Sequence, residues 1–381
     1  GIYFPSSGTL TINNSTINAK TMGVQVCAGS LSINAGSAIT VSGDAVPKTE
    51  NDGAIQDGAA ISIVNRTGYK GLGDITVTGG TFTAKSGNAA IKAYNWANNT
   101  ESNFTASDKV AVSGGTFSSA VPAGLCATGY EPTGDAETGY TVGKAKVAEY
   151  NGVQYESLQE AINEAVKKNN QQTVTLLGDL TITETINFVK ETDASVILDL
   201  NGYTLTGNGC RALQINRGTL YLENGTVTST GIINSSSVIR IGSDEAAYTN
   251  KVPKLYMRKG AKVLAPDSYG VTIFGSATRG EYLSVSNATI EATGPSPAIS
   301  GNGSANCNTD DRTGWKAEEI LIGVGAVISA TDNYAIYHPE SGKLNIQGGT
   351  ITGTGGIQMC SGTLRIVNSP SITATGDPDL G

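Results

Sequence analysis

The feature that most constrains this chain is a long internal duplication. Residues 1–44 read GIYFPSSGTLTINNSTINAKTMGVQVCAGSLSINAGSAITVSGD, and residues 335–377 read AIYHPESGKLNIQGGTITGTGGIQMCSGTLRIVNSPSITATGD. The two segments align almost without gaps, with matched pairs Tyr3/Tyr337, Pro5/Pro339, Leu10/Leu344, Cys27/Cys360 and Asp44/Asp377. Self-similarity at a fixed interval indicates a repeat architecture. We interpret the chain as part of a tandem array with a unit of about 330 residues.

A finer repeat lies inside the units. Within each unit, a pattern of the type L-x-I-x-x-G-x-I-x-A, with substitutions, recurs every 20 to 44 residues. It begins at Leu10, Leu31, Ile75, Val110, Leu220, Leu255, Leu283, Ile320, Leu344 and Leu364. A shorter apolar alternation precedes most copies. Each period therefore predicts about three short strands that place Leu, Ile and Val on one face and Thr, Ser and Asn on the other.

Such short strands cannot bury an apolar face alone, but they can when successive coils stack. Stacking at the strand spacing of about 4.8 Å gives a continuous core and pairs the backbone groups. The 49 glycines, roughly twice the usual share, supply the corners between strands. We therefore predict an all-β chain that folds as a right-handed parallel β-helix, a solenoid with three short strands per coil.

One segment breaks the β pattern and predicts a helix that caps the second unit. Ser157 and Glu160 form a capping box, and the apolar residues that follow share one helical face. The open end of a solenoid needs such a cap, because uncovered strand edges pair with other chains. The preceding run GYEPTGDAETGYTVGKAK is interpreted as a linker. We thus expect residues 1–143 to be the C-terminal part of one β-helix unit and 144–381 the N-terminal part of a homologous second unit.

These runs also carry a family resemblance. The run VQYESLQEAINEAVKKNNQQTVTLLGDLTI, followed by SVILDLNGYTLTG, resembles the capped start of pectate-lyase-like right-handed β-helix domains. The run VSGGTFSSAVPAGLCATGYEPTGDAETGYTV resembles the closing repeats of such domains. The resemblance implies a large, adhesin-like surface protein of Gram-positive gut-type bacteria, at the cell surface or in the cell wall. It does not imply an activity, because this superfamily includes lyases, hydrolases, adhesins and passive stalks.

Composition excludes several other classes. The net charge is −8 and no basic run appears, so nucleic acid is a poor partner. No apolar run is long enough to insert in a membrane. The cysteines are scattered without metal-ligand spacing and are expected to be buried free thiols: Cys27, Cys126, Cys210, Cys307 and Cys360. We expect no cofactor and no metal.

Signs of catalysis are sparse. Asp310, Asp311 and Arg312 form the only dense acidic spot, which is similar to the Asn-Thr-Asp and Asp-Asp runs of β-helix polygalacturonases. The His-Gly and Arg-x-Lys motifs of that family are missing. We therefore expect a solvated loop at this position and keep these residues as a minor catalytic alternative. His338 is the only histidine, and its counterpart in the other copy is Phe4, so we assign His338 to packing or surface.

A binding role is suggested by insertions that recur at one position of the coil. Insertions at one topological position stack on one side of a solenoid, which is often its binding side. Their aromatic residues lie beside Asn, Asp and Arg, a combination that suits glycans: Tyr69, Tyr94, Trp96, Phe104, Tyr248 and Trp315. The alternative is that these rings fold back and cover the flank of the coil.

Three functions remain open. The first is a non-enzymatic extracellular β-helix module of a repetitive surface protein, which contacts glycans, a host or cell-surface protein, and neighbouring β-helix units. The second is a polysaccharide lyase or glycoside hydrolase, which needs several carboxylates, or carboxylates with Arg or Lys, in one groove. The third is a purely structural spacer.

Overall fold

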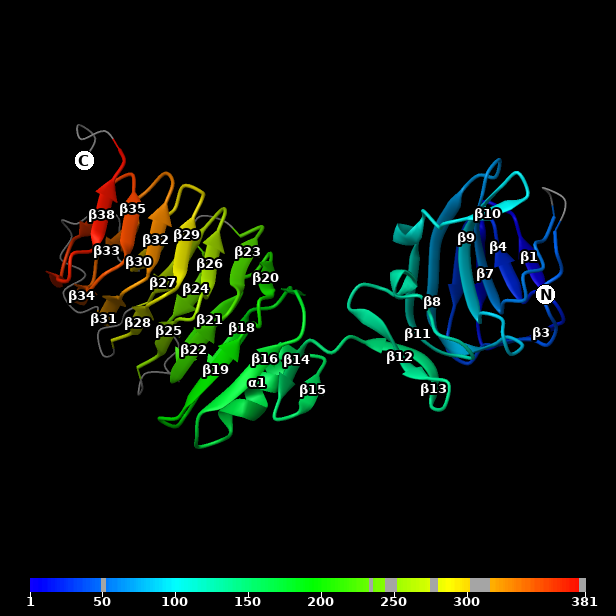
Figure 1. The fold of residues 1–381 in the computed structure, drawn as a ribbon, viewed down its shortest axis with the longest axis horizontal. Coiled ribbons are helices and arrows are strands. Elements are labelled where there is room, and N and C mark those ends of the chain that lie inside the picture. The colour runs from blue at the N-terminus through cyan, green and yellow to red at the C-terminus, as the bar shows by residue number, and fades with distance from the viewer. Residues whose placement is uncertain (49–52, 233–235, 244–251, 275–279, 302–315, 377–381) are drawn as a thin grey trace. The chain divides into compact units, whose positions relative to one another are not determined.

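The computed structural model describes residues 1–48, 53–232, 236–243, 252–274, 280–301 and 316–376. The chain divides into two compact units, Gly1–Ala145 (unit 1) and Lys146–Gly381 (unit 2). Both are built from stacked strands, and in unit 2 the described strands are drawn from green to red in chain order (Figure 1). Neighbouring strands are parallel, apart from one hairpin at the edge of a unit 1 sheet and the hairpins that end unit 1 and begin unit 2. No helix in the described ranges has the length and apolar character needed to cross a membrane.

Unit 2 contains three sheets, and after its opening hairpin each strand pairs with the strand three places further along the chain. Its first sheet holds, in order, β15 (Val153–Tyr155), β14 (Ala148–Tyr150), β16 (Gln172–Leu176), β19 (Ser195–Asp199), β22 (Thr219–Glu223), β25 (Lys254–Met257), β28 (Tyr282–Val285), β31 (Lys316–Ile322), β34 (Ser341–Ile346) and β37 (Thr363–Ile366). Its second sheet holds β17 (Leu180–Ile182), β20 (Thr204–Asn208), β23 (Thr226–Thr230), β26 (Lys262–Ala265), β29 (Thr289–Ala292), β32 (Val327–Ala330), β35 (Thr350–Gly353) and β38 (Ser371–Ala374). Its third sheet holds β18 (Ile186–Val189), β21 (Leu213–Arg217), β24 (Ser237–Ile241), β27 (Tyr269–Ile273), β30 (Ile299–Gly301), β33 (Ile336–His338) and β36 (Ile357–Met359). This order is compatible with a solenoid of three strands per coil.

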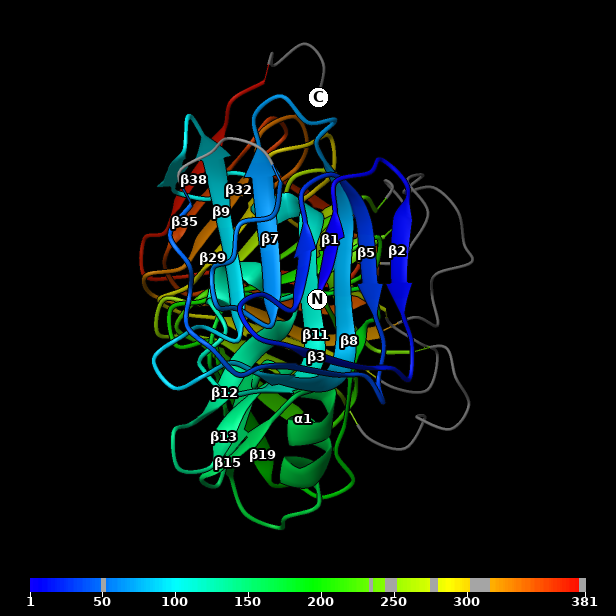
Figure 2. The ribbon, with the colours of Figure 1, turned by 90° about the vertical axis from the view of Figure 1, so that its right-hand side faces the viewer.

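Unit 1 is also built from stacked parallel strands, but these fall in two sheets. One sheet runs β1 (Ile2–Phe4), β4 (Val24–Val26), β7 (Ile61–Arg66), β9 (Ile91–Ala97) and β10 (Thr100–Ser102). The other runs β2 (Thr9–Ile12), β5 (Gly29–Ile33), β8 (Leu72–Thr83), β11 (Val110–Phe117), β13 (Gly139–Lys144) and β12 (Tyr130–Asp135), with β3 (Thr16–Ala19) and β6 (Ala38–Val41) paired beside it. Figure 2 shows β9, β7 and β1 in that order across the first of these sheets, and β4 lies between β7 and β1.

The alternation of apolar residues explains the core. In β5, Leu31 and Ile33 are buried, and they are in register with Ile75 and Val77 of β8. Rows of this kind run through each unit and form one main apolar cluster in unit 1 and one in unit 2. The apolar residues of a strand thus stack on their equivalents in the next coil, as the sequence pattern predicts.

The predicted helix is present as α1 (Leu158–Val166). The Ser157 side chain accepts a hydrogen bond from the Glu160 backbone N–H at 3.4 Å, which confirms the N-cap. Leu158, Ala161 and Ile162 are buried against the first strands of unit 2. With the antiparallel β14–β15 hairpin, α1 covers the beginning of the unit 2 core.

Two expectations about local structure are wrong. The segment interpreted as a linker is a hairpin: β12 and β13 pair antiparallel, and β13 pairs antiparallel with the last part of β11. Not all glycines form corners between strands: Gly79, Gly80, Gly114 and Gly115 lie inside the long strands β8 and β11. Glycine is needed there because the ladder between these strands shifts register at 112–116, and Gly115 has a φ of 115°.

The cysteines also differ from expectation. Cys27, Cys126 and Cys210 are free, and only Cys27 is fully buried. Cys360, however, is disulfide-bonded, although its counterpart Cys27 in the other copy is not. Cys307 lies outside the described residues. The prediction of free thiols throughout was therefore wrong, because sequence spacing does not show which distant residues a solenoid brings together.

Candidate functional site

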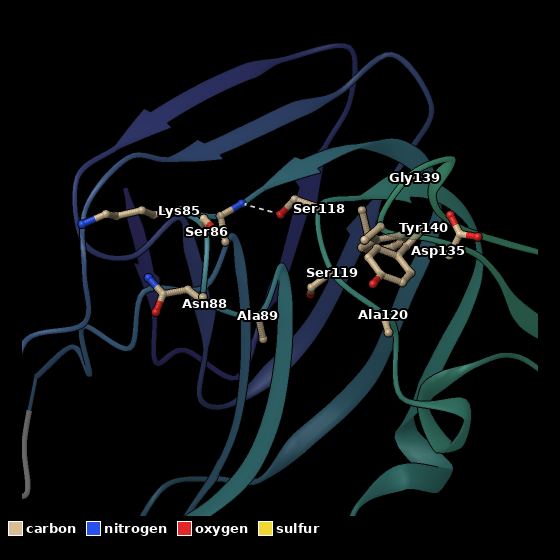
Figure 3. A pocket seen from close by; sticks show the side chains of 14 residues that line it. Lys85, Ser86, Asn88, Ala89, Ser118, Ser119, Ala120, Asp135, Gly139 and Tyr140 are labelled. Atoms are coloured by element: carbon tan, nitrogen blue, oxygen red, sulfur yellow. Dashed lines mark hydrogen bonds between the residues drawn. The ribbon is translucent and has the colours of Figure 1, made fainter.

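Unit 1 contains a cleft of about 690 Å³ with both polar and apolar lining residues, which we call the polar cleft. Three segments form it: the turn after β8, the residues that follow β11, and the tip of the β12–β13 hairpin (Figure 3). The lining residues include two alanines that flank the turn, Ala84 and Ala89, and the polar or aromatic side chains Lys85, Ser86, Asn88, Ser118, Ser119, Asp135 and Tyr140. The hairpin that sequence reasoning missed thus supplies one wall of the cleft.

Two serine hydroxyls that line this cleft accept hydrogen bonds from backbone N–H groups. The Ser118 hydroxyl accepts from the Ala84 backbone N–H at 2.9 Å, drawn as a dashed line in Figure 3. The Ser119 hydroxyl accepts from the Ala90 N–H at 2.8 Å. Both bonds tie the segment after β11 to the turn between β8 and β9. These hydrogen bonds therefore fix the relative positions of two of the segments that form the cleft.

The hairpin wall is also preorganised. One carboxylate oxygen of Asp135 accepts bonds from the backbone N–H groups of Glu137 and Thr138 and from the Thr138 hydroxyl, at 2.8–2.9 Å. These bonds, first those from Thr138, lower the pKa of Asp135, so this carboxylate is ionised at neutral pH. Tyr140 pairs with Phe117 across β13 and β11 and packs partly against the core. Its ring and hydroxyl are thereby held at the cleft.

The lining of the cleft offers several hydroxyls, one amide, one ammonium group, one carboxylate and two aromatic rings, groups that can hold a polyhydroxylated ligand. Its single acidic residue, Asp135, has no second carboxylate among the lining residues, whereas glycoside hydrolysis uses a pair. In the ranges the structure describes, no group of three or more His, Cys, Asp or Glu side chains is placed to hold a metal ion.

The residues proposed from the sequence as glycan contacts differ in where they lie in the structure. Tyr94 and Trp96 are only 2% and 6% exposed, so neither ring offers a face to a sugar, which corrects the expectation for both. They form a separate small cluster with Cys27, Ile55 and Val64 on the outer side of the first sheet of unit 1. The alternative, in which the rings cover the flank of the coil, holds for these two.

A glutamine explains why these rings are covered. The Gln25 side chain donates to the Ile55 carbonyl at 2.7 Å and accepts from the Ile55 N–H at 2.8 Å, which fastens the chain around Ile55 over the sheet. Asp57 then bonds the Tyr94 hydroxyl at 2.8 Å and the Ser62 hydroxyl at 2.7 Å. Burial raises the pKa of Asp57.

Of the remaining sequence candidates, some lie in the described part of the structure and the others lie outside it. Tyr69 lines a second, smaller pocket of unit 1 and is partly buried. Phe104 is partly buried against the main core of unit 1. Tyr248, Trp315 and the minor catalytic candidates Asp310, Asp311 and Arg312 lie outside the described residues. His338 is buried, in agreement with a packing role.

The chain matches no family model, no curated protein and no solved structure.

Proposed function

We propose that this chain is a non-enzymatic, extracellular segment of a large repetitive cell-surface protein, built from right-handed, pectate-lyase-like β-helix units, and that unit 1 binds glycans through the polar cleft. The observation that carries the proposal is the pair of terminal structures at residues 130–166. The β12–β13 hairpin covers the last long strand of unit 1, and the β14–β15 hairpin with α1 covers the first coil of unit 2. One capped module ends where the next begins, as in an array of modules in series.

A general preference of chain geometry supports a right-handed coil. Both units connect parallel strands within one sheet by crossovers through the other sheets. Such connections are right-handed in about 98% of cases, because right-twisted strands pack back onto the sheet only that way. This supports a right-handed β-helix.

An extracellular location is supported by the cysteine chemistry. Cys360 is disulfide-bonded, and disulfides persist mainly in oxidising environments such as the cell surface. The surface residues of the strands are mostly Thr, Ser and Asn, with few charges in the chain as a whole. A surface of this kind suits a stalk that displays its binding sites on turns and hairpins.

Glycan binding by the cleft can be tested on an array of neutral and acidic glycans with the full chain. Tyr140→Phe removes one hydroxyl from the cleft and keeps the ring that packs on the core. We expect it to weaken binding of a retained glycan about three- to tenfold, the value of one hydrogen bond. Tyr130→Phe is the matched control, because Tyr130 lies in the same hairpin and packs on the same core but does not line the cleft.

The enzyme alternative predicts a different result. A lyase or hydrolase would release unsaturated or reducing ends from a polysaccharide panel at a rate above the buffer control. Turnover of this kind would overturn the non-enzymatic proposal. If no glycan binds saturably and no polysaccharide is turned over, the results favour the purely structural spacer.

A further inference from the structure

The first strands of the three unit 2 sheets differ in how their outer edges, which face away from the following coils, are closed. The outer edge of β16 is paired with β14 of the opening hairpin. The outer edge of β18 is closed by one side chain: Gln159 Oε1 accepts from the Asn187 backbone N–H at 2.7 Å, and Gln159 Nε2 donates to the Asn187 carbonyl at 2.9 Å. Among the described strands, by contrast, only β20 pairs with β17. The outer edge of β17 is therefore free.

This free edge offers backbone donors and acceptors to another strand. Cys210, which follows β20, donates from Sγ to the Ile182 carbonyl at 3.6 Å, so the backbone groups of Ile182 face β20. Successive residues of a strand direct their backbone groups to opposite edges, so the N–H and C=O of Thr181 face the free edge. Thr181 is exposed. An unpaired edge of this kind is a template for pairing with another chain.

A groove of about 520 Å³ follows the same edge. Its walls are Glu156–Gln159 at the start of α1 and residues 180–187 from β17 to β18, with Val147 between them in the lining. Val147, Leu180 and Ile182 pack against the main core of unit 2 but stay only partly buried. The cap helix thus leaves this corner of the core incompletely covered. An extended segment laid along β17 would cover these apolar side chains and pair with the backbone of Thr181, as in β-strand addition.

The charge of the groove favours a basic segment. Its lining contains two acidic residues, Glu156 and Glu184, and no lysine or arginine. Glu156 pairs with Lys146 at 2.7 Å. Glu184 is exposed, and within the described part of the chain no ion pair joins it to a basic side chain. The partial positive charge at the start of α1 is offset by Glu160 in its first turn.

We propose that β17 docks an extended segment of a partner protein, which pairs with the free edge and places a lysine or arginine beside Glu184. A second copy of this chain suits the groove less well, because β38, the strand at the opposite edge of the same sheet, reads Ser-Ile-Thr-Ala and has no basic residue. The docking strand lies in unit 2 and takes a protein ligand, so it is independent of the proposed glycan cleft in unit 1.

The test measures hydrogen–deuterium exchange of the full chain, resolved to single residues, with three heptapeptide probes. The first alternates valine and lysine, the second replaces each lysine by glutamate, and the third is the first with every backbone nitrogen methylated. The lysine peptide should slow exchange of the Thr181 amide, because that N–H becomes bonded. The glutamate peptide should protect it less at equal concentration. The methylated peptide keeps the charges but can donate no backbone hydrogen bond, and should give no protection.

Substitutions test the edge and the charge separately, with affinity measured by isothermal titration calorimetry. Thr181→Pro removes the outward N–H and adds a ring at the edge, so it should weaken binding of the lysine peptide about tenfold or more. Thr181→Ser keeps both backbone groups and is its matched control. Glu184→Gln should weaken binding about two- to fivefold, the value of one exposed ion pair. Glu137→Gln, the same change at an exposed site in unit 1, should have no effect.

Several outcomes would overturn the proposal. Equal binding of the methylated and unmethylated lysine peptides would show attraction by charge without strand pairing, and this arm needs no variant to fold. Equal binding of the lysine and glutamate peptides would overturn the basic ligand. Concentration-dependent self-association that protects Thr181 would assign the edge to a second copy. Absence of protection at millimolar lysine peptide would show that β17 is a solvated edge that docks nothing of this kind.

Discussion

The ammonium group of Lys190 donates to the backbone carbonyls of Val166, at 2.9 Å, and Lys168, at 2.5 Å, at the C-terminal end of α1. A helix leaves its last carbonyls without partners, and its C-terminal end carries partial negative charge. Lys190 is the residue that directly follows strand β18. Its side chain is fully buried and reaches both carbonyls. One lysine thus fastens the cap helix to the first coil of unit 2.

Lys190→Met is therefore expected to lower the free energy of unfolding. Methionine keeps the apolar stem but supplies no donor, so the two part-buried carbonyls lose a charged hydrogen-bond partner, an interaction of about 1.5–3 kcal/mol. Chemical denaturation of the full chain measures the change. The control is Lys167→Met, which breaks an exposed ion pair with Glu164 and should cost about 0–1 kcal/mol. Similar losses in the two variants would show that Lys190 does not cap the helix.

His338 and its counterpart Phe4 give a prediction for acid. Burial lowers the pKa of His338 and outweighs the backbone hydrogen bonds that raise it. The folded state therefore favours the neutral ring more than the unfolded state does. Its contribution to stability is present above the unfolded pKa of about 6.5 and is lost as the pH falls below that value.

His338→Phe, the residue that the chain itself uses at the equivalent position, removes this titration. We expect the variant to lose less stability than the parent between pH 7 and pH 5. Unfolding midpoints at several pH values check this. Parallel curves for the two proteins would show that His338 is not held neutral by the fold.

The two copies of the repeat also show what the next coil contributes. Leu364 of β37 is 41% exposed, whereas its equivalent Leu31 is 1% exposed because β8 stacks on it. The same substitution should then have very different effects. Leu31→Ala should cost about 2–5 kcal/mol, as expected for a fully buried leucine. Leu364→Ala should cost less than about 1 kcal/mol, because half-exposed side chains contribute little. Equal costs would mean that Leu364 is covered in solution.

Much of this architecture could be predicted from the sequence, and the parts that could not share a physical cause. Ser157, Glu160 and the apolar face of α1 act within a few residues of one another, so the helix and its cap could be predicted from local pattern alone. Apolar alternation likewise predicts the stacking of Leu31 on Ile75. Both features depend on a short-range periodicity of apolar residues, which the sequence shows directly.

The β12–β13 hairpin was missed because Pro132 and the surrounding glycines are typical of turns and linkers. Its stability depends on cross-strand pairs such as Thr133 with Thr141, whose hydroxyls are 2.6 Å apart, and on its attachment to β11. Neither interaction can be predicted until the positions of both strands are known. The polar cleft could not be predicted for the same reason, since one of its walls is this hairpin.

The burial of Tyr94 and Trp96 depends on a contact between distant residues. Alternation along β9 places both rings on the face opposite Ile91, which looks like solvent from the sequence. Only the bonds between Gln25 and Ile55 show that another part of the chain covers that face. An aromatic residue beside polar neighbours therefore does not distinguish a binding ring from one covered by a loop.

Asp57 and Tyr94 allow this covered cluster to be tested by pH. Tyr94→Phe should destabilise the chain by about 1–3 kcal/mol at neutral pH, because one buried carboxylate oxygen of Asp57 loses its donor. Burial already raises the pKa of Asp57, and loss of this donor raises it further. A carboxyl group with a raised folded pKa favours folding when it is protonated, and this contribution is lost as the pH rises through the folded pKa.

The destabilisation by Tyr94→Phe should consequently be smaller near pH 4 than at pH 8. Denaturation curves of the variant and the parent at both pH values measure it. The matched control is Tyr130→Phe, whose hydroxyl does not contact Asp57 in the described structure and whose effect should not vary with pH. A loss that is the same at pH 4 and pH 8 would show that the Tyr94 hydroxyl stabilises the cluster by packing and not by bonding the Asp57 carboxylate.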